Sequence, residues 1–321
     1  MKNEIKSWIQ ENKDEIGFNS EVELVDISSG ESNHTFEVIS KKSGEIKILR
    51  TSFKVSKDRI NHESQILDFL KKLEIGNVPR KLYYIKDSSI KQPILVETHI
   101  GEEDIDANSL NSDQVKDLAE MLAKIHSVDS KEYNRFMDGE KPITSSLGYE
   151  FREDFKEYSK KPFEEYKELV EEVDERVLKF YNKQKALVRE AENTYEEVEW
   201  RMCHGDISDN LRVNKDGSLS LVDWELARPG IPRFELIYMF KHSDFSKEEQ
   251  ENFLKEYRSI RETSSIADKW SSKRWKFLAF NDMIWAAKRK EKLKIQGEEY
   301  SKYEELFEER LKELQELYNN Q

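Results

Sequence analysis

Hydrophobic positions change their period along the chain, from short runs near its beginning to helical stripes further on. Before residue 101, apolar and β-branched residues gather in short runs between turn residues, as in strands, while positions 60, 66, 67 and 70 have helical spacing. The pattern predicts a short helix near the N-terminus, followed by an α+β unit made of a small antiparallel sheet and one helix. In chain order we expect a helix within 1–16, strands at 21–27, 35–40 and 45–50, a helix at 58–73, and strands at 82–85 and 93–100.

After Gly101 the apolar positions indicate helices almost throughout. Regular helical stripes cover 115–126, 163–181 and 300–318. The chain of 321 residues is also longer than one ordinary domain core requires. We therefore predict two lobes, a small one of residues 1–100 that contains the sheet and a larger, mostly helical one of residues 101–321.

One segment departs from the helical pattern and carries candidate chemistry. His204-Gly205-Asp206 is followed by two β-like runs joined by Asp216-Gly217, which is a strong signal for a two-residue hairpin turn. With the turn centred there, Asn210 faces Asp223, and directly opposed side chains lie about 5 Å apart. The hairpin then places an amide beside a carboxylate, with Asp206 one short loop away.

Amide and carboxylate oxygens suit a hard cation such as Mg²⁺, which binds through one or two protein groups and phosphate oxygens. A separate carboxylate can accept the proton of an attacking hydroxyl, so these are the parts that phosphoryl transfer requires. The alternative is that Asp206 and Asp223 are ordinary turn residues. Against it, Asp223 lies between the apolar residues Val222 and Trp224, where a buried acid needs a partner.

The signature His204-Gly205-Asp206, Asn210 and Asp223-Trp224-Glu225 resembles the catalytic motif of the aminoglycoside phosphotransferase and choline kinase family, which shares the protein-kinase fold. The resemblance covers about residues 20–130 and 200–240 and implies a two-lobed, protein-kinase-like structure. Its other parts follow in order: a phosphate loop at 29–36, a third strand at 46–50, the helix glutamate Glu63, the approach to a hinge at 78–80 and 95–97, and a helix at 118–126.

The resemblance implies a role for each matching residue. Asp206 is the catalytic base, Asn210 and Asp223 hold Mg²⁺, and Glu225 reaches a second metal or the substrate. The spacing from Asp206 to Asn210 is one residue shorter than the commonest family loop, so Asp209 is an alternative ligand, although the hairpin register favours Asn210. The nucleotide is expected to meet Gly30, Ser32 and Asn33 of the phosphate loop, Arg50 with its partner Glu63, and the backbone of Glu97 and His99 at the adenine.

Arg50 stands where the family has the nucleotide lysine, and Lys47 is its rival. Strand alternation separates the two, because residues two apart share a face. Ile48 shares the face of Arg50 and is apolar, as a surface beneath a nucleotide requires. Glu45 shares the face of Lys47 and would repel phosphate. The sequence therefore favours Arg50, paired with Glu63.

Charge and composition narrow the partners. The chain has 66 acidic and 53 basic side chains, and the resulting net charge of −13 disfavours nucleic acid. No apolar run approaches the length of a membrane span, and the first residues lack the apolar stretch of a signal peptide. The single cysteine, Cys203, excludes an intramolecular disulfide and a cysteine-based zinc site. We expect a cytoplasmic protein without a membrane partner.

The sequence thus predicts a Mg²⁺-dependent enzyme that moves the γ-phosphate of ATP or GTP to a hydroxyl of a small molecule such as an aminoglycoside, an amino alcohol or a sugar. A peptide acceptor is disfavoured, because Pro232 follows Asp223 by only nine residues, too few for a long activation segment. Arg50 and the shortened loop favour an alternative, a catalytically silent, kinase-like nucleotide-binding protein. A purely helical interaction protein would require the strands to be misassigned. His204 is expected to bond loop backbone, since Asp206 already fills the position of the base.

Overall fold

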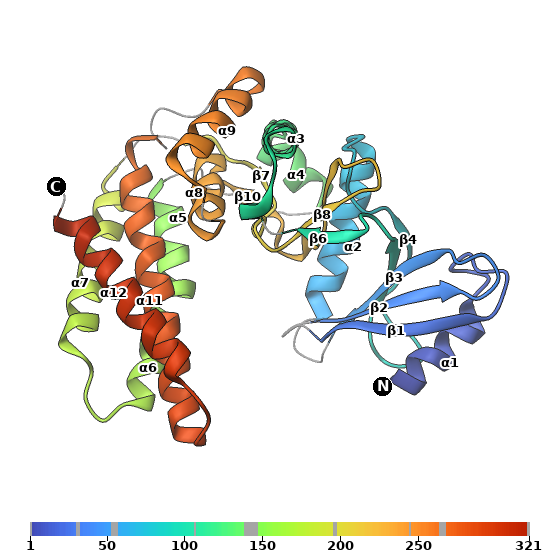
Figure 1. Cartoon of the computed structure of the whole chain (residues 1–321), viewed down its shortest axis with the longest axis horizontal. Helices are drawn as coiled ribbons and strands as arrows, with labels where there is room; N and C mark the ends of the chain where they lie inside the picture. The colour runs from blue at the N-terminus through green and yellow to red at the C-terminus, as the bar shows by residue number, and fades with distance from the viewer. Residues whose placement is uncertain are drawn as a thin grey trace. The chain divides into compact units, whose positions relative to one another are not determined.

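The computed structural model describes residues 2–29, 33–52, 57–105, 107–137, 147–194, 198–243, 245–262 and 268–319. Near the N-terminus it contains a five-stranded sheet with the strand order β1-β2-β3-β5-β4, in which every pair is antiparallel (Figure 1). The strands are β1 (Val22–Ser29), β2 (Asn33–Ser40), β3 (Ile46–Ser52), β4 (Lys81–Ile85) and β5 (Ile94–Thr98). The sheet expected from the sequence is therefore present.

The two faces of this sheet differ in chemistry. Helix α1 (Lys2–Asn12) packs its buried side chains Ile5, Trp8 and Ile9 into an apolar cluster with residues of the sheet that include Leu49. Helix α2 (Lys57–Lys72) carries Glu63, which bonds Arg50 of β3. Since neighbouring residues of a strand point to opposite faces, the α1 face is mainly apolar, whereas the α2 face carries the pair of Arg50 and Glu63.

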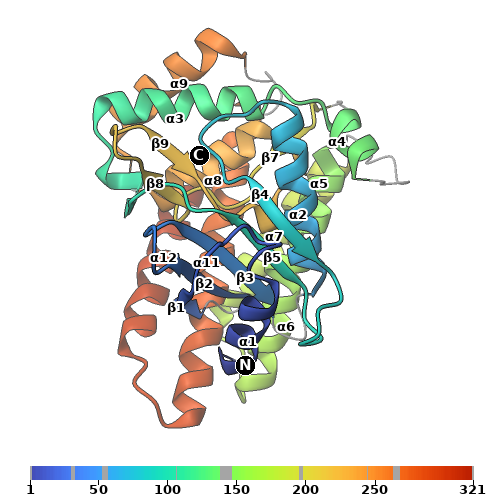
Figure 2. The same ribbon diagram turned by 90° about the vertical axis from the view of Figure 1, so that its right-hand side faces the viewer.

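Short strands and three helices follow the sheet in the chain. Strands β6, β8 and β9 form a three-stranded sheet in that order, β7 pairs with β10, and α3 packs against α9 (Figure 2). The bounds are β6 (Glu103–Ile105), α3 (Ser112–Ile125), α4 (Ser130–Phe136), β7 (Arg201–Cys203), β8 (Leu211–Val213), β9 (Leu219–Leu221), β10 (Arg228–Gly230) and α9 (Lys247–Ile260), with 3-10 turns at Ala107–Ser109 and Trp224–Leu226.

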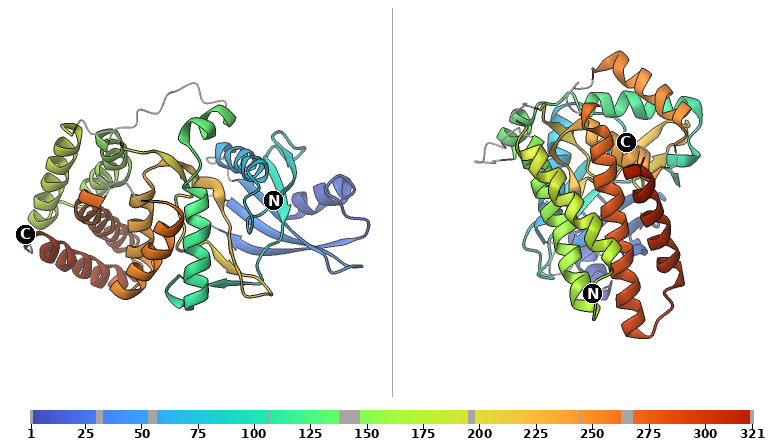
Figure 3. Two further views of the ribbon diagram at one scale, coloured as in Figure 1. Left: turned by 90° about the horizontal axis from the view of Figure 1, so that it is seen from above. Right: turned by 90° about the vertical axis from the view of Figure 1, so that its left-hand side faces the viewer.

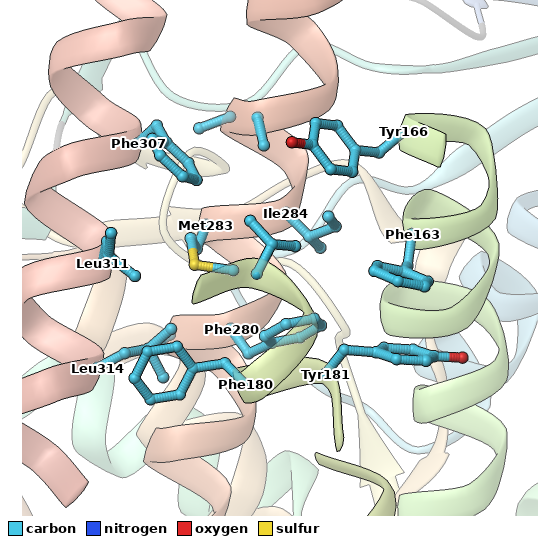
Figure 4. Close-up of a cluster of buried hydrophobic side chains, with 14 residues drawn as sticks. Phe163, Tyr166, Phe180, Tyr181, Phe280, Met283, Ile284, Phe307, Leu311 and Leu314 are labelled. Atoms are coloured by element: carbon cyan, nitrogen blue, oxygen red, sulfur yellow. The ribbon is translucent and has the colours of Figure 1, made fainter. Parts of the chain in front are cut away.

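The remaining helices enclose a second apolar core. Long helices lie side by side (Figure 3), and aromatic and aliphatic side chains from α6, α7, α11 and α12 fill the space between them (Figure 4). The helices are α5 (Leu147–Asp154), α6 (Lys161–Leu169), α7 (Glu175–Glu192), α8 (Pro232–His242), α11 (Ser271–Gln296) and α12 (Ser301–Asn319), and a π-helical turn at Phe155–Lys160 joins α5 to α6.

One expected helix is wrong. The apolar stripe over 163–181 belongs to two helices, α6 and α7, and not to one. Val170 is extended at the end of α6, and the Asp174 side chain accepts a hydrogen bond from the Arg176 backbone N–H as the cap of α7. The stripe itself is buried, since Phe163 and Phe180 both enter the same core, so the pattern indicated the burial and missed the break.

The chain forms two compact units by packing. The first consists of Met1–Lys141, Arg201–Pro229 and His242–Glu262, and the second of Pro142–Trp200, Gly230–Lys241 and Thr263–Gln321. The two lobes expected from the sequence, 1–100 and 101–321, follow the change from strands to helices and stay a prediction. Among the described residues, no helix combines the length and the apolar character needed to cross a membrane.

Candidate active site

Arg50 lies on the α2 face of β3, where two carboxylates hold it. Its Nη1 donates to Glu63 Oε1 over 2.5 Å, and its Nη2 donates to Asp223 Oδ1 over 2.8 Å. The Arg50 side chain is 7% exposed and that of Glu63 1%. The expected ion pair between Arg50 and Glu63 is therefore present, and the guanidinium also reaches the candidate metal ligand.

Lys47, the rival of Arg50, lies on the other face of β3. Its Nζ donates to the backbone carbonyls of Ile16 and Gly17 over 2.8 and 2.9 Å and lies 4.3 Å from the centroid of the Phe18 ring. These contacts tie the strand to the segment that follows α1. The alternation of side chains along the strand therefore places Arg50 and Lys47 on opposite faces of β3, and the structure has the same arrangement.

Asp223 follows β9 with the left-handed backbone conformation that few residues other than glycine adopt, at φ 61°. The next residue, Trp224, is fully buried, and its backbone N–H donates to Glu63 Oε1 over 3.0 Å. Glu63 Oε1 therefore accepts from both Arg50 and Trp224, which fixes the Asp223 segment against α2. The partner expected for this partly buried acid is Arg50.

Glu97 adds a third carboxylate to this face. In the register of β3 and β5 it lies opposite Ile48, so its side chain shares the face of Arg50. Glu97 is 4% exposed, and its Oε2 has no hydrogen-bond partner among the described residues. Burial raises the pKa of Glu97 to about 7, with Arg50 opposing this rise and Asp223 adding to it.

The same cluster shifts the other two groups. Burial raises the pKa of Glu63 well above its ordinary value, although Arg50 opposes this, and Glu97 and Asp223 add to it. Burial by itself disfavours the charged guanidinium, but the attraction of Glu63, Asp223 and Glu97 outweighs it and raises the pKa of Arg50. The cation is thus surrounded by more acid than it neutralises, and this excess favours a second cation nearby.

The loop His204-Gly205-Asp206 is held by backbone contacts. The buried His204 ring bonds the Val222 carbonyl through Nε2 over 2.9 Å, and the Asp206 N–H donates to its Nδ1 over 3.2 Å. The ring therefore connects the loop to the strand before Asp223. The expectation that His204 bonds loop backbone is confirmed.

Gly205 lies where a side chain has no room. Its φ is +93°, and a Cβ at this position would lie 2.5 Å from the backbone oxygen of Leu226. Leu226 belongs to the turn that follows Asp223. The close approach brings the Asp206 loop and the Asp223 turn into direct contact, which explains why the motif contains glycine here.

Asp206 and Asn210 are bonded to each other across the loop. Asn210 Nδ2 donates to the Asp206 carbonyl over 2.8 Å, which leaves Oδ1 as the atom that can ligate a cation. Burial raises the pKa of the Asp206 side chain to about 6, and the nearby charges of Asp209 and Asp223 add to this rise. A hydrogen bond from the Asn210 side chain opposes it. Asp206 and Asp223 are thus electrostatic neighbours, with Asn210 beside them.

The hairpin register expected from the sequence is wrong by one residue. Leu211 pairs with Leu221, and the Val222 N–H donates to the Asn210 carbonyl, so the partner of Asn210 is Val222 and not Asp223. The reason is the turn. Asn214 and Ser218 close a loop of three residues that ends with Gly217 at φ +85°, where a two-residue turn was expected.

The structure places the remaining expected residues as follows. Glu225 Oε1 lies 3.0 Å from Arg59 Nη1, and His99 Nε2 lies 4.0 Å from Glu37 Oε1. Asn33 begins β2 opposite Ser52 of β3. Gly30 and Ser32 lie outside the described residues. The functional roles of all these residues stay predictions.

Two side chains near the site did not emerge from the sequence. For Glu97 only the backbone was considered, yet alternation along β5 places its side chain beside Arg50. Arg59 lies one helical turn before Glu63 on α2, a spacing that puts both on one side of the helix. The sequence contained a signal for both residues: the two-residue alternation of a strand for Glu97, and the spacing of four residues along a helix for Arg59.

The residues expected to hold Mg²⁺ offer oxygen atoms only. Asn210 provides an amide oxygen, and Asp223 provides a carboxylate whose side chain is 35% exposed. Glu225, with a side chain 11% exposed, adds a second carboxylate. Such a set fits a hard divalent cation that keeps some water and phosphate ligands.

The class of protein is that of the kinase-like phosphotransferases. Three features indicate it: the small antiparallel sheet, the cation–glutamate pair between β3 and α2, and the His-Gly-Asp loop. The family model described as "Phosphotransferase enzyme family" matches residues 23–271. The chain belongs to this phosphotransferase family. A sequence search of curated proteins finds no match.

Solved structures of similar fold come from small-molecule kinases. Wild-type aminoglycoside 2'-phosphotransferase-IIIa with GDP is 16% identical, with 97% of this chain and 98% of that chain covered and a TM-score of 0.65. The choline kinase LicA from Streptococcus pneumoniae is 19% identical, with 98% and 99% covered and a TM-score of 0.60. An ethanolamine kinase from Plasmodium vivax is 16% identical, with 95% and 85% covered and a TM-score of 0.63.

These comparisons decide three expectations. The family resemblance is confirmed by the family match. The fold class, α+β with a small antiparallel sheet lobe and a larger helical part of the protein-kinase type, is confirmed by the similar structures. The expectation of an enzyme, a small-molecule kinase of the phosphotransferase class, is confirmed as well.

Proposed function

We propose that this protein transfers the γ-phosphoryl group of ATP or GTP to a hydroxyl of a small molecule in a Mg²⁺-dependent reaction. The observation that carries the proposal is the linked set Arg50, Glu63 and Asp223, with Asp206 as the electrostatic neighbour of Asp223. The chemistry needs a positioned cation for the phosphates, oxygen ligands for a metal and a base for the acceptor, and this set contains all three.

Arg50 is the residue that holds the phosphates. Glu63 and Asp223 fix its guanidinium on one side, while its Nε is buried without a partner among the described residues. The planar fork offers five N–H bonds, so donors remain for phosphate oxygens after both ion pairs are made. Glu63 acts as a positioning residue, since it orients Arg50 and the Trp224 backbone together.

Asp206 is the proton acceptor for the attacking hydroxyl. Its pKa of about 6 keeps the carboxylate ionised at neutral pH, while its affinity for a proton is higher than that of an exposed aspartate. The Asp206 backbone N–H donates a hydrogen bond to His204 Nδ1, and the Asn210 side chain donates one to the Asp206 carbonyl. These two hydrogen bonds hold the Asp206 backbone in place.

Asn210 and Asp223 are the Mg²⁺ ligands of the proposal, with Glu225 as a third candidate. When bound, the metal neutralises charge on the phosphates during transfer. Arg50 and Mg²⁺ would then share the Asp223 carboxylate, one oxygen for each cation. Gly30, Ser32 and Asn33 are expected beside the phosphates, and the backbone of Glu97 and His99 beside the base.

The acceptor class rests on the chain's relatives and on its short segment after Asp223. One similar structure contains kanamycin, and others are named as choline and ethanolamine kinases. All these acceptors carry amino groups or quaternary nitrogen as well as hydroxyls, and a chain with a net charge of −13 attracts such cations. Amino alcohols and aminoglycosides are therefore the first acceptors to test, followed by sugars. The similar structures contain GDP and ADP, so both ATP and GTP belong in the screen.

The test is a phosphate-transfer screen of these acceptors with both nucleotides, with and without Mg²⁺. We expect one nucleotide and acceptor pair to give turnover that Asp206→Asn reduces about 10²- to 10⁴-fold. Asp209→Asn tests the alternative metal ligand, an exposed acid whose removal leaves the metal requirement unchanged if Asn210 is the ligand. Glu103→Gln, at an exposed position on β6, is the control for loss of one negative charge. Stabilisation by Mg-nucleotide without turnover on any acceptor would instead favour the catalytically silent protein.

A further inference from the structure

A cluster of lysines surrounds one tyrosine ring in the second unit. Tyr318 of α12 has the Nζ of Lys183 at 3.8 Å from its ring centroid and the Nζ of Lys276 at 4.7 Å. Lys183 comes from α7 and Lys276 from α11. Phe180 completes the group, with its ring 5.6 Å from Tyr318 and 5.4 Å from the Lys183 Nζ.

Within the part of the chain that the structure describes, no carboxylate neutralises these lysines. Among the described residues, Lys179, Lys183 and Lys276 form no ion pair, although Lys276 is only 4% exposed. Burial lowers the pKa of Lys183, and the charge of Lys179 lowers it further. Burial likewise lowers the pKa of Lys276, and the charges of Lys183 and Lys273 add to that effect.

This arrangement is costly in a chain with 66 acidic and 53 basic side chains. Elsewhere on the same helices, lysines do find acids, as Lys288 does with Glu165 and Lys273 with Glu190. Like charges held together lose solvation and repel each other. The cation–aromatic contacts with Tyr318 and Phe180 offset only part of this cost. A negatively charged ligand would remove the repulsion.

A pocket of about 210 Å³ lies beside this cluster. Two lysines line it, Lys179 and Lys183 of α7, together with the amides of Gln315 and Asn319. Arg176 also lines it, but its guanidinium already bonds the carboxylates of Asp174 and Glu308. No acid is among the described residues that line it, and the rings of Phe180 and Tyr318 form its apolar wall. The space holds several times the volume of a water molecule, which is about 30 Å³.

From this pocket we infer a binding site for a phosphate monoester, between α7 and the C-terminal helix α12. The lysines and amides are hydrogen-bond donors that match the three oxygens of a phosphate dianion. The two aromatic rings match a small carbon skeleton attached to it. All residues involved belong to the second unit, whereas Arg50 and Asp206 belong to the first, so the inference does not depend on the proposed reaction.

The test follows Lys183 itself. Lysines carrying ¹³C-dimethyl groups keep their charge and give NMR signals, and Lys183→Gln and Lys276→Gln assign the two signals of interest. We expect saturable shifts of both signals on addition of glycerol 3-phosphate, and a pKa of Lys183 that rises with it, because an anion stabilises the ammonium form. Inorganic phosphate should act at higher concentration, since it lacks the carbon skeleton.

The matched variants are Lys179→Gln and Lys185→Gln on the same helix. Lys179 is exposed, so its replacement should leave the fold intact and weaken binding of the ester about tenfold, as loss of a charged hydrogen bond predicts. Lys185 lies 5.7 Å from the Tyr181 ring and does not line the pocket, so Lys185→Gln should bind as the parent does. The inference is overturned if glycerol 3-phosphate leaves the Lys183 signal unmoved, if chloride at equal ionic strength moves it equally, or if inorganic phosphate binds as tightly as the ester.

Discussion

At the scale of single residues, Arg50 explains how the candidate site is assembled. A lysine has one ammonium group, whereas the guanidinium fork reaches Glu63 and Asp223 at the same time. The residue that departs from the family's usual lysine therefore links β3, α2 and the turn at Asp223 in one contact. As a consequence, several carboxylates lie around one cation, and the pKa of Glu97 is raised by burial and by the charge of Asp223.

Asp206 gives a pH-dependent prediction. Because burial raises its pKa to about 6, the carboxylate becomes protonated as the pH falls through that value and can no longer accept a proton. We expect kcat/KM, which reports the free enzyme, to fall tenfold per pH unit below about 6. Rates between pH 5 and 8 measure this limb. In Asp206→Asn the remaining activity should no longer fall below pH 6. If the fall persists in this variant, it is caused by a group other than Asp206.

Glu97 gives a prediction about stability. Its pKa of about 7 in the folded protein lies above the ordinary 4.5, so the folded state binds the proton more tightly than the unfolded state does. The stability gained in this way is complete below pH 4.5 and is lost as the pH rises through 7. Glu97→Gln removes this dependence. Between pH 4.5 and pH 8, the free energy of unfolding of the variant should rise relative to that of the parent by roughly 3 kcal/mol at most, given about 1.4 kcal/mol per pKa unit.

Urea denaturation at both pH values measures the Glu97 effect. Glu103→Gln, at an exposed position on β6, is the control for loss of one negative charge. It should differ from the parent by the same small amount at both pH values. A Glu97→Gln variant that behaves like this control would mean that Glu97 is ionised in the folded protein throughout the range.

At the scale of elements, the contact between the Asp206 loop and the Asp223 turn gives a prediction about Gly205. A Cβ there would lie 2.5 Å from the Leu226 oxygen at a φ of +93°. Gly205→Ala should therefore cost roughly 2–5 kcal/mol of stability, from backbone strain and overpacking together, and most of the activity. Thermal unfolding and turnover measure the two effects.

Gly44 is the matched control for Gly205. It has a φ of +73°, yet nothing lies within 4 Å of its Cβ position in the turn between β2 and β3. Gly44→Ala should cost only the backbone strain, about 1–2 kcal/mol, and leave turnover unchanged. Equal losses in both variants would show that strain, and not the contact with Leu226, is what Gly205 avoids.

The elements also show which parts of the fold the sequence could predict. Alternation along β3 was enough to place Arg50 and Lys47 on opposite faces, because a period of two fixes the face of every residue once one is known. The hairpin register failed by one residue, because Asp216-Gly217 suits more than one turn, and the two turns place Gly217 differently. The break between α6 and α7 was missed because residues 170–174 contain neither glycine nor proline.

The candidate site was predictable where its residues are close in sequence. The motif from His204 to Asp223 contains the three oxygen-bearing side chains of the candidate site, Asp206, Asn210 and Asp223. The helix glutamate, Glu63, followed from the family resemblance. The hydrogen bond from the Trp224 backbone to Glu63 joins residues 161 positions apart, and the Arg59–Glu225 pair joins residues 166 apart. Such contacts depend on how whole elements pack, which local patterns do not encode.

At the scale of the whole molecule, the candidate chemistry is confined to one of the two packing units. Every expected site residue that the structure describes belongs to the first unit, from Arg50 on β3 to Asp223 after β9. The second unit has its own core, built from α6, α7, α11 and α12, and its own basic pocket. The two proposals therefore predict that a nucleotide and a phosphate monoester bind to different units.

This division predicts the pattern of amide hydrogen exchange with ligand. We expect a non-hydrolysable ATP analogue with Mg²⁺ to bind the first unit and to slow exchange there, in β3, α2, β5 and the β8–β9 hairpin, because binding lowers the population of locally open states. Helices α7, α11 and α12 should change little. Mass spectrometry of peptides from both units, with the metal-free analogue as the control, measures the difference. Equal protection of both units would show that they open as one cooperative body, and protection of the second unit alone would place the nucleotide away from Arg50.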